Sequence, residues 1–294
     1  MFRSGIAYVS DERCPLPYLT VFIVRKGVTM ITLCKACGTS YDNHHGNVKR
    51  CKICDDERQY IPVSGQAWMD FDELIASHTN KWQQHTPQLF SLKTVPSFAI
   101  NQRAFLLRTP VGNILWDCVA NLDPATRTLI RAMGGLSAIA ISHPHYYTTM
   151  QDWAEAFDAP VWLHAADRDW IMRDSPWIRL WEGEEHNVLP GVSLLRLGGH
   201  FAGGTVLYLE EGEGTILAGD ILQVTPGADA VSFMWSYPNM LPLSSKTVGG
   251  IIQRLNTVTF SSLYGAFEGQ NITHNASQIV QRSGEKYLSS LASR

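Results

Sequence analysis

The sequence predicts a layered α/β fold with a mixed sheet, preceded by a small cysteine module. Two observations support this prediction. Expected strands and helices mix along most of the chain, with hairpins early in each half, which is typical of sheets covered by helices. In addition, four of the six cysteines fall close together near the N-terminus, the pattern of a separate metal-binding unit.

The composition is that of a globular protein. Of the 294 residues, 45% are hydrophobic and 17% are charged, which is enough apolar material for a core that needs no disulfides. A net charge of −3 excludes a general nucleic-acid binder and a polybasic membrane binder. No run resembles a membrane span or a signal peptide, and the clustered cysteines fit a reducing compartment. We therefore expect a cytoplasmic protein that acts on a small molecule, whose oligomeric state stays open.

The N-terminal third divides into three predicted segments. Residues 1–29 show no periodicity and are expected to be a disordered extension or the result of an upstream start choice. Residues 30–62 form the cysteine module. Residues 63–94 are expected to form a linking helix, which begins at Asp70 with carboxylates in its first turn and runs to about Gln84.

Residues 95–294 are predicted to form one large α/β domain. Its strands are short apolar runs bounded by Gly, Pro, Asn or Asp. Asp123 and Pro124 mark the start of a helix, and Gly134 marks its end. The expected strands are 98–100, 104–108, 114–118, 136–142, 159–164, 192–197, 204–209, 215–218 and 260–266. The expected helices are 123–134, 151–157, 246–255 and 275–291.

The clustered cysteines form two Cys-x-x-Cys pairs. Each pair places two thiolates on one tight turn, and two such turns complete a tetrahedral all-sulfur site. We predict structural zinc there, with rubredoxin-like iron as the alternative because four thiolates suit either metal. A closed site of this kind leaves no open position for hydrolysis, and Cys14 and Cys118 stand outside it. The predicted ligands are Cys34, Cys37, Cys51 and Cys54.

Three predicted strands of the large domain end in residues that bind metals. His143 and His145 directly follow one strand, and two histidines at i and i+2 can point at one metal. His200 follows a second strand within Gly-Gly-His, and Asp220 follows a third within Gly-Asp. Because α/β folds collect functional groups at strand ends, we expect these four residues to form a second metal site.

The order of strand, His-x-His, Gly-Gly-His and Gly-Asp resembles the metallo-β-lactamase-fold hydrolase superfamily. The resemblance covers roughly residues 95–290 and includes the early hairpin 104–118. It implies an αββα sandwich with the metal at one edge. With the four-cysteine zinc ribbon in front, the chain resembles an uncharacterised bacterial subgroup of such proteins.

Two departures from the superfamily pattern indicate that its second metal site is dismantled. The superfamily's His-x-His-x-Asp-His becomes His-Pro-His-Tyr-Tyr-Thr, so that Tyr147 and Thr148 replace two ligands. Its final Gly-His is replaced by residues 265–269, where Glu268 is the only potential ligand. The remaining set would hold one metal through His143, His145 and His200, with Asp220 as a fourth ligand or as a partner of a ligand.

Three other residues are predicted to serve catalysis at this site. The superfamily's aspartate, which usually orients the nucleophile, is missing here. Tyr146 or Tyr147 could instead donate a hydrogen bond to an oxyanion. His164, at the end of its strand with Asp167 nearby, could act as a proton shuttle or could be purely structural. The aromatic run 233–238 follows the Gly-Asp pair and is expected to cover the metal with an apolar wall.

Three functions are compatible with these residues. The leading hypothesis is a mononuclear metal-dependent hydrolase of a small ester, lactone or thioester, in which zinc-bound hydroxide attacks the substrate. The second is an iron redox or oxygenase-type member of the same superfamily, with His143, His200 and Asp220 as the ligands; iron is possible in either site. The third is a non-catalytic binding module with a degenerate hydrolase fold, whose zinc ribbon contacts a partner.

Overall fold

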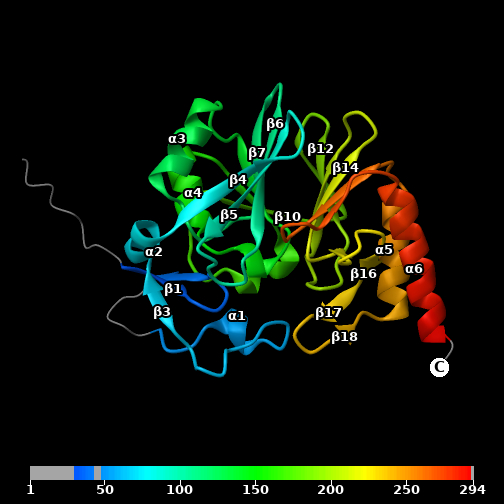
Figure 1. Cartoon of the computed structure of the whole chain (residues 1–294), viewed down its shortest axis with the longest axis horizontal. Coiled ribbons are helices and arrows are strands. Elements are labelled where there is room, and N and C mark those ends of the chain that lie inside the picture. Colours follow the sequence, from blue (N-terminus) through cyan, green and yellow to red (C-terminus); the bar gives the residue numbers. More distant parts are fainter. Residues whose placement is uncertain (1–29, 43–47, 293–294) are drawn as a thin grey trace, which may run out of the picture.

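Two twisted sheets face each other in the centre of the molecule, and helices cover their outer faces (Figure 1). This computed structural model describes residues 30–42 and 48–292 of the chain. The predicted extension at residues 1–29, with Cys14, lies outside the described residues, as do His44 and His45.

The first sheet has seven strands in the order β10-β9-β8-β7-β6-β5-β4. Neighbouring strands are antiparallel from β4 to β7 and parallel from β7 to β10. The strands are β4 (Thr79–Gln84), β5 (Leu89–Val95), β6 (Arg103–Thr109), β7 (Gly112–Trp116), β8 (Ala138–Ala140), β9 (Val161–His164) and β10 (Ile178–Trp181).

The second sheet has six strands in the order β11-β12-β13-β14-β19-β20, and only β14 and β19 pair in parallel among them. They are β11 (Glu185–Leu189), β12 (Val192–Arg196), β13 (Thr205–Leu209), β14 (Thr215–Gly219), β19 (Ser262–Gly265) and β20 (Asn271–Ile272). Two small hairpins follow β14 along the chain: β15 (Gln223–Val224) with β16 (Val231–Ser232), and β17 (Met234–Ser236) with β18 (Leu241–Pro242).

Four helices complete an αββα sandwich, as the sequence predicts. α3 (Pro124–Ala132) and α4 (Met150–Phe157) lie beside the first sheet, whereas α5 (Ser245–Leu255) and α6 (Ala276–Ala292) lie beside the second (Figure 1). The start of α3 is confirmed, since the Asp123 side chain accepts a hydrogen bond from the Thr126 backbone N–H.

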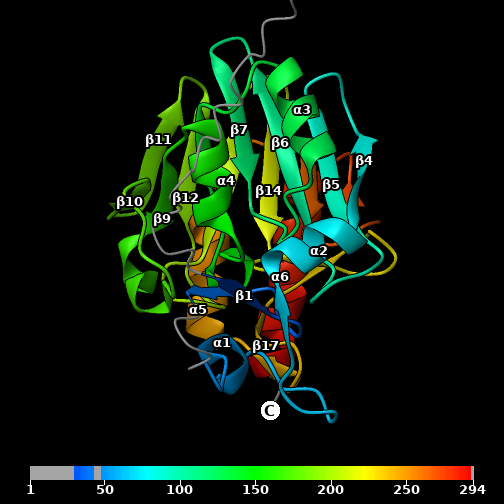
Figure 2. The same ribbon diagram turned by 90° about the vertical axis from the view of Figure 1, so that its left-hand side faces the viewer.

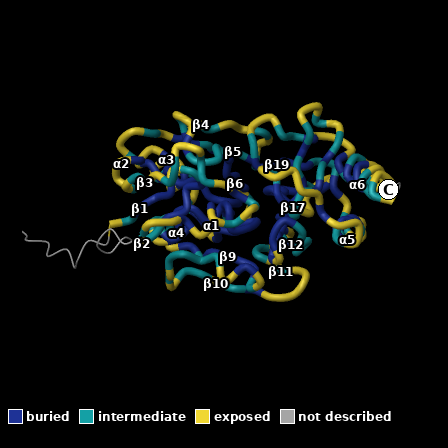
Figure 3. The backbone as a smooth tube through the Cα atoms, turned by 90° about the horizontal axis from the view of Figure 1, so that it is seen from below, coloured by how far each residue is buried: buried dark blue, intermediate teal, exposed yellow. Residues whose placement is uncertain are grey.

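The core has three layers because the central strands are buried on both faces. In β6, Phe105 and Leu107 point between the sheets, while Leu106 packs toward α3 and α4. In β14, Leu217 points between the sheets and Ile216 toward α5 and α6. Successive strand residues face opposite sides, so a continuous apolar run fills two layers at once. Figure 3 shows buried residues gathered inside the sandwich and exposed residues in the outer loops.

The four-cysteine module forms its own small sheet in the order β2-β1-β3. Its elements are β1 (Ile31–Cys34), β2 (Ser40–Asp42), α1 (Lys52–Asp55) and β3 (Trp68–Asp70), followed by α2 (Phe71–Ser77). Figures 1 and 2 place this module across one end of the sandwich, with α1 close to β17. The module therefore covers the edge at which the sequence predicts the second metal site.

Two expectations for the secondary structure are wrong. The helix that begins after Asp70 ends at Ser77 and does not reach Gln84, because the chain continues as β4 and pairs with β5 along its whole length. Residues 98–100 form a turn and not a strand, since Ala99 has a φ of 53°. Much of the predicted linking helix is therefore sheet that extends the sandwich at β4 and β5.

Among the described residues, no helix combines the length and apolar character that a membrane crossing requires.

Candidate metal centres

The two histidines of the His-x-His pair lie just beyond β8, where the 3-10 helix η2 (Pro144–Tyr146) turns the chain. His200 follows β12, and Asp220 follows β14 directly. The structure brings these four side chains together: one ligand atom from each lies within 4.8 Å of every other. The sheet topology thus brings four residues from three separate parts of the sequence to one edge of the sandwich.

Distances within this cluster match the spacing of ligands around one small metal ion. His145 Nδ1 lies 3.3 Å from His200 Nε2, and His143 Nε2 lies 3.6 Å from the nearer Asp220 oxygen. Zinc–nitrogen bonds of about 2.0–2.1 Å in a tetrahedron place two ligand atoms about 3.3–3.4 Å apart. The four residues therefore fit a metal with three nitrogen ligands and one oxygen ligand.

Unsatisfied polar atoms point to the same conclusion. Each of the four residues is at most 5% exposed. Within the described part of the chain, His143 Nε2, His145 Nε2 and Asp220 Oδ1 have no hydrogen-bond partner. Buried polar atoms are rarely left without a partner, because desolvation without compensation is costly. A metal ion at the cluster would provide the partner for His143 Nε2, the atom that faces the Asp220 carboxylate.

Hydrogen bonds from other residues fix the histidine rings. Ser142 Oγ lies 2.8 Å from His143 Nδ1, and Asp117 Oδ1 accepts both the N–H and the hydroxyl of Ser142. His200 Nδ1 lies 2.7 Å from the carbonyl oxygen of Trp235, and the other ring nitrogen, Nε2, faces His145 Nδ1 in the cluster. Such partners set the tautomer and orientation of a metal-binding histidine. The sequence prediction missed Asp117, although it too follows a strand end.

Burial controls the protonation of the cluster. Burial lowers the pKa of His143 and His145 well below the usual range, and it lowers the pKa of His200 to about 4 despite the Trp235 hydrogen bond. Burial also raises the pKa of Asp220 to about 7, an effect that Tyr146 partly offsets. Neutral imidazoles are the form that binds a metal. A cation at this site would in turn favour ionised Asp220.

The predicted catalytic tyrosines have different surroundings. The Tyr146 ring lies 4.5 Å from the ring of His143, and its hydroxyl has no hydrogen-bond partner of standard geometry among the described residues. Burial and the charge of Asp220 raise the pKa of Tyr146 well above its usual value, so its phenol stays neutral. Tyr147 instead packs into the core beside α4 and faces the charge of Asp167.

His164 does not join the cluster. Its Nε2 lies 3.0 Å from the Gly183 carbonyl oxygen, and its Nδ1 accepts the Ala166 N–H. Both ring nitrogens are engaged at the end of β9, and the ring packs on Trp181. Asp167, which lies nearby in the sequence, accepts the Gly203 N–H.

The positions of the second metal site hold no ligand cluster within the described residues. Thr148 is buried, and its carbonyl oxygen accepts hydrogen bonds from the backbone N–H and the hydroxyl of Ser40. Glu268 is not part of the histidine cluster and forms ion pairs with Lys81 and Lys93. Glu268 therefore does not replace a lost ligand in this structure.

The four predicted cysteine ligands also meet. Cys34 Sγ lies 3.6 Å from Cys54 Sγ, and Cys37 Sγ lies 3.5 Å from Cys51 Sγ. Zinc–sulfur bonds of about 2.3 Å would place the sulfurs about 3.8 Å apart. All four side chains are buried free thiols, and Gly38 beside them has a φ of 81° that suits the tight turn. This geometry fits a closed tetrahedral site.

Aromatic residues cover the histidine cluster, partly as the sequence predicts. From the run 233–238, Trp235 provides the carbonyl oxygen for His200, and the Tyr237 hydroxyl donates to the Asp220 carbonyl oxygen. Arg58 of the cysteine module also lies over this face, with its guanidinium 3.8 Å from the Phe201 ring centroid. No sequence pattern pointed to Arg58.

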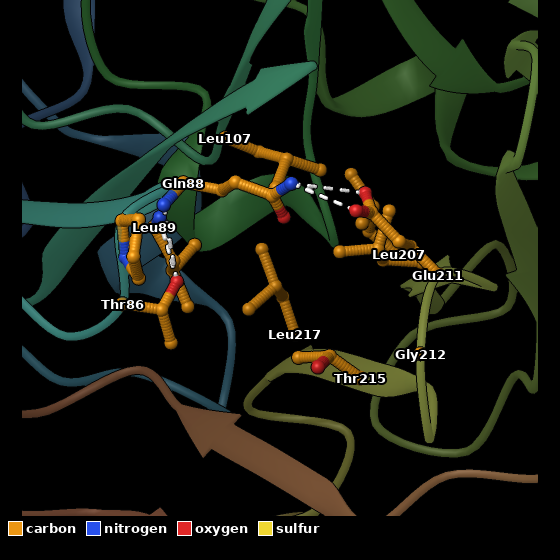
Figure 4. A pocket seen from close by; sticks show the side chains of 11 residues that line it. Thr86, Gln88, Leu89, Leu107, Leu207, Glu211, Gly212, Thr215 and Leu217 are labelled. Atoms are coloured by element: carbon orange, nitrogen blue, oxygen red, sulfur yellow. Dashed lines mark hydrogen bonds between the residues drawn. The ribbon is translucent and has the colours of Figure 1, made fainter. Parts of the chain in front are cut away.

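A separate cavity of about 350 Å³ lies between the sheets, beside the start of β14. The histidine cluster lies beyond the other end of this strand, where Asp220 follows it. Leucines including Leu107, Leu207 and Leu217 line it, and Gln88 Nε2 donates to the Glu211 carboxylate across its mouth (Figure 4). Neither set of metal-binding residues contributes to this cavity.

The solved structures that share this arrangement of elements include metallo-β-lactamases. The DIM-1 metallo-β-lactamase matches 72% of this chain and all of its own, with a TM-score of 0.55 and 12% identity. The metallo-β-lactamase SMB-1 matches 72% of this chain and 96% of its own, with a TM-score of 0.50 and 20% identity. The chain therefore has the metallo-β-lactamase fold.

A comparison with curated proteins adds the family. The uncharacterized protein YmaE of Bacillus subtilis (strain 168) is 42% identical over 269 residues, which cover 89% of this chain and 97% of YmaE. The chain belongs to the same family as YmaE. No family model matches the sequence.

Proposed function

We propose that this protein is a mononuclear metal-dependent hydrolase of a small ester, lactone or thioester. One observation carries the proposal: three neutral histidines and one aspartate converge in a buried cluster, and His143 Nε2, which faces Asp220, has no hydrogen-bond partner among the described residues. The metallo-β-lactamase fold supports a hydrolase in general. The single cluster, without ligands at the second position among the described residues, supports the mononuclear form.

Zinc in such a site supplies Lewis acidity and lowers the pKa of a coordinated water to about 7. His143, His145 and His200 would hold the metal, and Asp220 would be a fourth ligand or would orient the entering water. Tyr146 keeps its proton, and in this proposal its hydroxyl would donate a hydrogen bond to the oxygen on which negative charge develops.

The aromatic residues over the histidine cluster limit how a substrate can reach it. The ligands are at most 5% exposed, so a substrate reaches them only when the aromatic cover parts. The rings near the cluster include Phe201 and Tyr237, which lie 5.1 and 5.4 Å from the ring of His200. This aromatic surrounding favours an apolar substrate over a highly charged one.

An iron oxygenase is the second candidate, because His143, His200 and Asp220 form the two-histidine, one-carboxylate set of non-haem iron enzymes. The identity of the metal separates the two candidates. A coloured protein with iron at the histidine cluster would favour the second, and a colourless zinc protein would favour the first.

The test is turnover of a panel that contains p-nitrophenyl esters, a simple lactone and an acyl thioester. We expect metal-dependent hydrolysis of at least one member, abolished by His200→Ala. His274→Ala removes an exposed histidine remote from the cluster and should leave turnover unchanged. Failure of the zinc-loaded protein on the whole panel would favour the non-catalytic binding module. Activity that survives His200→Ala would refute the site.

A further inference from the structure

A short segment of the cysteine module connects the two candidate metal centres. α1 carries Cys54, and residues 56–58 follow it directly. Arg58 donates from Nε and Nη2 to the two carboxylate oxygens of Asp56, at 2.6 and 2.9 Å. Its third nitrogen, Nη1, donates to the His200 backbone carbonyl oxygen at 3.1 Å. One side chain therefore joins the module to a predicted ligand of the other centre.

Aromatic rings hold this guanidinium in place. It lies 3.8 Å from the ring centroid of Phe201, 5.2 Å from that of Trp170 and 5.5 Å from that of Trp235. The side chain of Arg58 is only 12% exposed. Cation–π contacts and paired hydrogen bonds strengthen when water is excluded, so Arg58 is fixed more firmly than a surface arginine.

The same segment also holds the residue next to Trp235, whose carbonyl oxygen contacts the ring of His200. The carbonyl oxygen of Glu57 accepts hydrogen bonds from Ser236 Oγ at 2.6 Å and from Asn239 Nδ2 at 2.7 Å. Ser236 is fully buried and adjoins Trp235, whose carbonyl oxygen lies 2.7 Å from His200 Nδ1. The module thus fixes His200 on both its backbone side and its ring side.

The segment has little stability of its own. α1 has only four residues, and a helix of one turn does not persist without other support. That support comes from Cys51 and Cys54 at its two ends, if the thiolates share a metal. Loss of the thiolate-bound metal would release residues 56–58 and, with them, the groups that orient His200.

We propose that Arg58 is a positioning residue for the histidine centre, and that metal binding at the two centres is coupled through it. The proposal rests on one part of the proposed function, that the histidine cluster binds a metal, and it holds for any substrate. Coupling of this kind is reciprocal, so occupation of either centre favours occupation of the other.

A second arginine between the module and the sandwich provides a matched control. Arg173 donates to Asp42 of β2 at 3.0 Å and to Asp152 of α4 at 2.6 Å. It attaches the module as Arg58 does, but its side-chain hydrogen bonds go to Asp42, Ser40 and Asp152 and not to the histidines. Arg173→Met should therefore weaken docking of the module without misplacing His200.

The first test measures Co²⁺ affinity at the histidine centre, from d–d absorption in competition with a chelator, after zinc has filled the thiolate centre. Arg58→Met should weaken this affinity about 10–100-fold, as loss of an orienting contact does at other metal sites. Arg58→Lys keeps the charge and should recover part of the affinity. Arg173→Met should stay within about twofold of the unmodified protein.

The second test measures the coupling itself. Cys54→Ser weakens the thiolate centre, and we expect it to lower Co²⁺ affinity at the histidine centre. The same substitution should have little further effect in the Arg58→Met background, because the connection is already lost. Additive effects of the two substitutions would refute the coupling.

The remaining outcomes are also decisive. Unchanged Co²⁺ affinity in Arg58→Met would overturn the positioning role while leaving the proposed function intact. If the unmodified protein binds no Co²⁺ at the histidines, the proposed function fails as well. If Arg58→Met does not fold, Arg58→Lys takes its place, because a lysine cannot make the three hydrogen bonds of Arg58 at once. A Co²⁺ affinity equal to that of the unmodified protein would then count against the proposal.

Discussion

Asp117 Oδ1 accepts two hydrogen bonds from Ser142, one from the Ser142 backbone nitrogen at 2.7 Å and one from Ser142 Oγ at 2.8 Å. Ser142 Oγ in turn lies 2.8 Å from His143 Nδ1. This chain of contacts joins the end of β7 to the first histidine after β8. Burial raises the pKa of Asp117 to about 8, although both Ser142 hydrogen bonds lower it. A fully buried carboxyl is thus used to orient one candidate ligand.

Asp117→Ala should reduce both stability and metal binding. The substitution leaves the buried N–H of Ser142 without its partner and leaves its hydroxyl with His143 Nδ1 alone, at a cost of about 1–3 kcal/mol in the free energy of unfolding. Metal affinity at the histidines should fall about 10–100-fold because His143 loses its orientation. Urea unfolding and Co²⁺ titration measure the two effects. Asp117→Asn keeps an acceptor oxygen and should be milder, and equal damage from both variants would argue against the orienting role.

Gly219→Ala should disturb the contact between Ser142 and Asp117 from the end of β14, in the second sheet. Gly219 has a φ of 55°, and a Cβ added there would lie 2.4 Å from Ser142 Oγ. Left-handed strain together with this overlap should lower the free energy of unfolding by roughly 2–4 kcal/mol. Gly212→Ala is the matched control, because Gly212 has a φ of 66° and open space around its Cβ position. Thermal unfolding should show a clearly larger loss for Gly219→Ala, whereas equal losses would exclude the overlap as the cause.

Glu268→Gln should leave the metal content unchanged. The hydrogen bonds and charges of Lys81 and Lys93 lower the pKa of Glu268 to about 2, and all three side chains lie toward solvent or are only partly buried. Exposed ion pairs contribute about 0–1 kcal/mol each, so the loss of stability should be small. Elemental analysis and urea unfolding check both expectations. A lost equivalent of metal in this variant would restore Glu268 as a ligand.

His85 should make the protein less stable in mild acid. Burial, with a smaller contribution from the charge of Arg103, lowers the pKa of His85 to about 4 in the folded protein, against about 6.5 in the unfolded chain. Below about pH 6.5 the unfolded chain gains a proton that the folded protein does not bind, so the free energy of unfolding falls until about pH 4.

His85→Gln tests this effect, because glutamine does not titrate and can still hydrogen-bond to Ser91, the present partner of His85 Nε2. Urea unfolding at about pH 7 and about pH 5 should show a smaller fall in stability for the variant than for the unmodified protein. Parallel falls in the two proteins would contradict the assigned pKa.

The sequence locates the members of both side-chain clusters because each leaves a local signal. His143, His145, His200 and Asp220 follow apolar runs, so the tendency of functional groups to gather at strand ends locates them from the sequence alone. The cysteine pairs are likewise visible from their spacing. These signals do not depend on how distant segments meet.

The missed residues lack such a signal. Arg58 contacts His200 across 142 positions of the chain, and no local pattern distinguishes it from other arginines near a turn. Asp117 lies inside the predicted strand 114–118, whereas in the structure β7 ends at Trp116 and Asp117 follows it. The strand β4 was missed for a related reason. The sequence predicts that the helix continues to about Gln84, but pairing with β5 makes the residues after Ser77 a strand.

The most direct test is the metal content of the purified protein and two variants. Two candidate centres predict two metal ions per chain in the unmodified protein. His143→Ala combined with His145→Ala should lose one ion and keep the other, and Cys51→Ser should release the ion bound by the thiolates. A single ion per chain that survives the double histidine substitution would show that the histidine cluster binds no metal, and would contradict the proposed hydrolase.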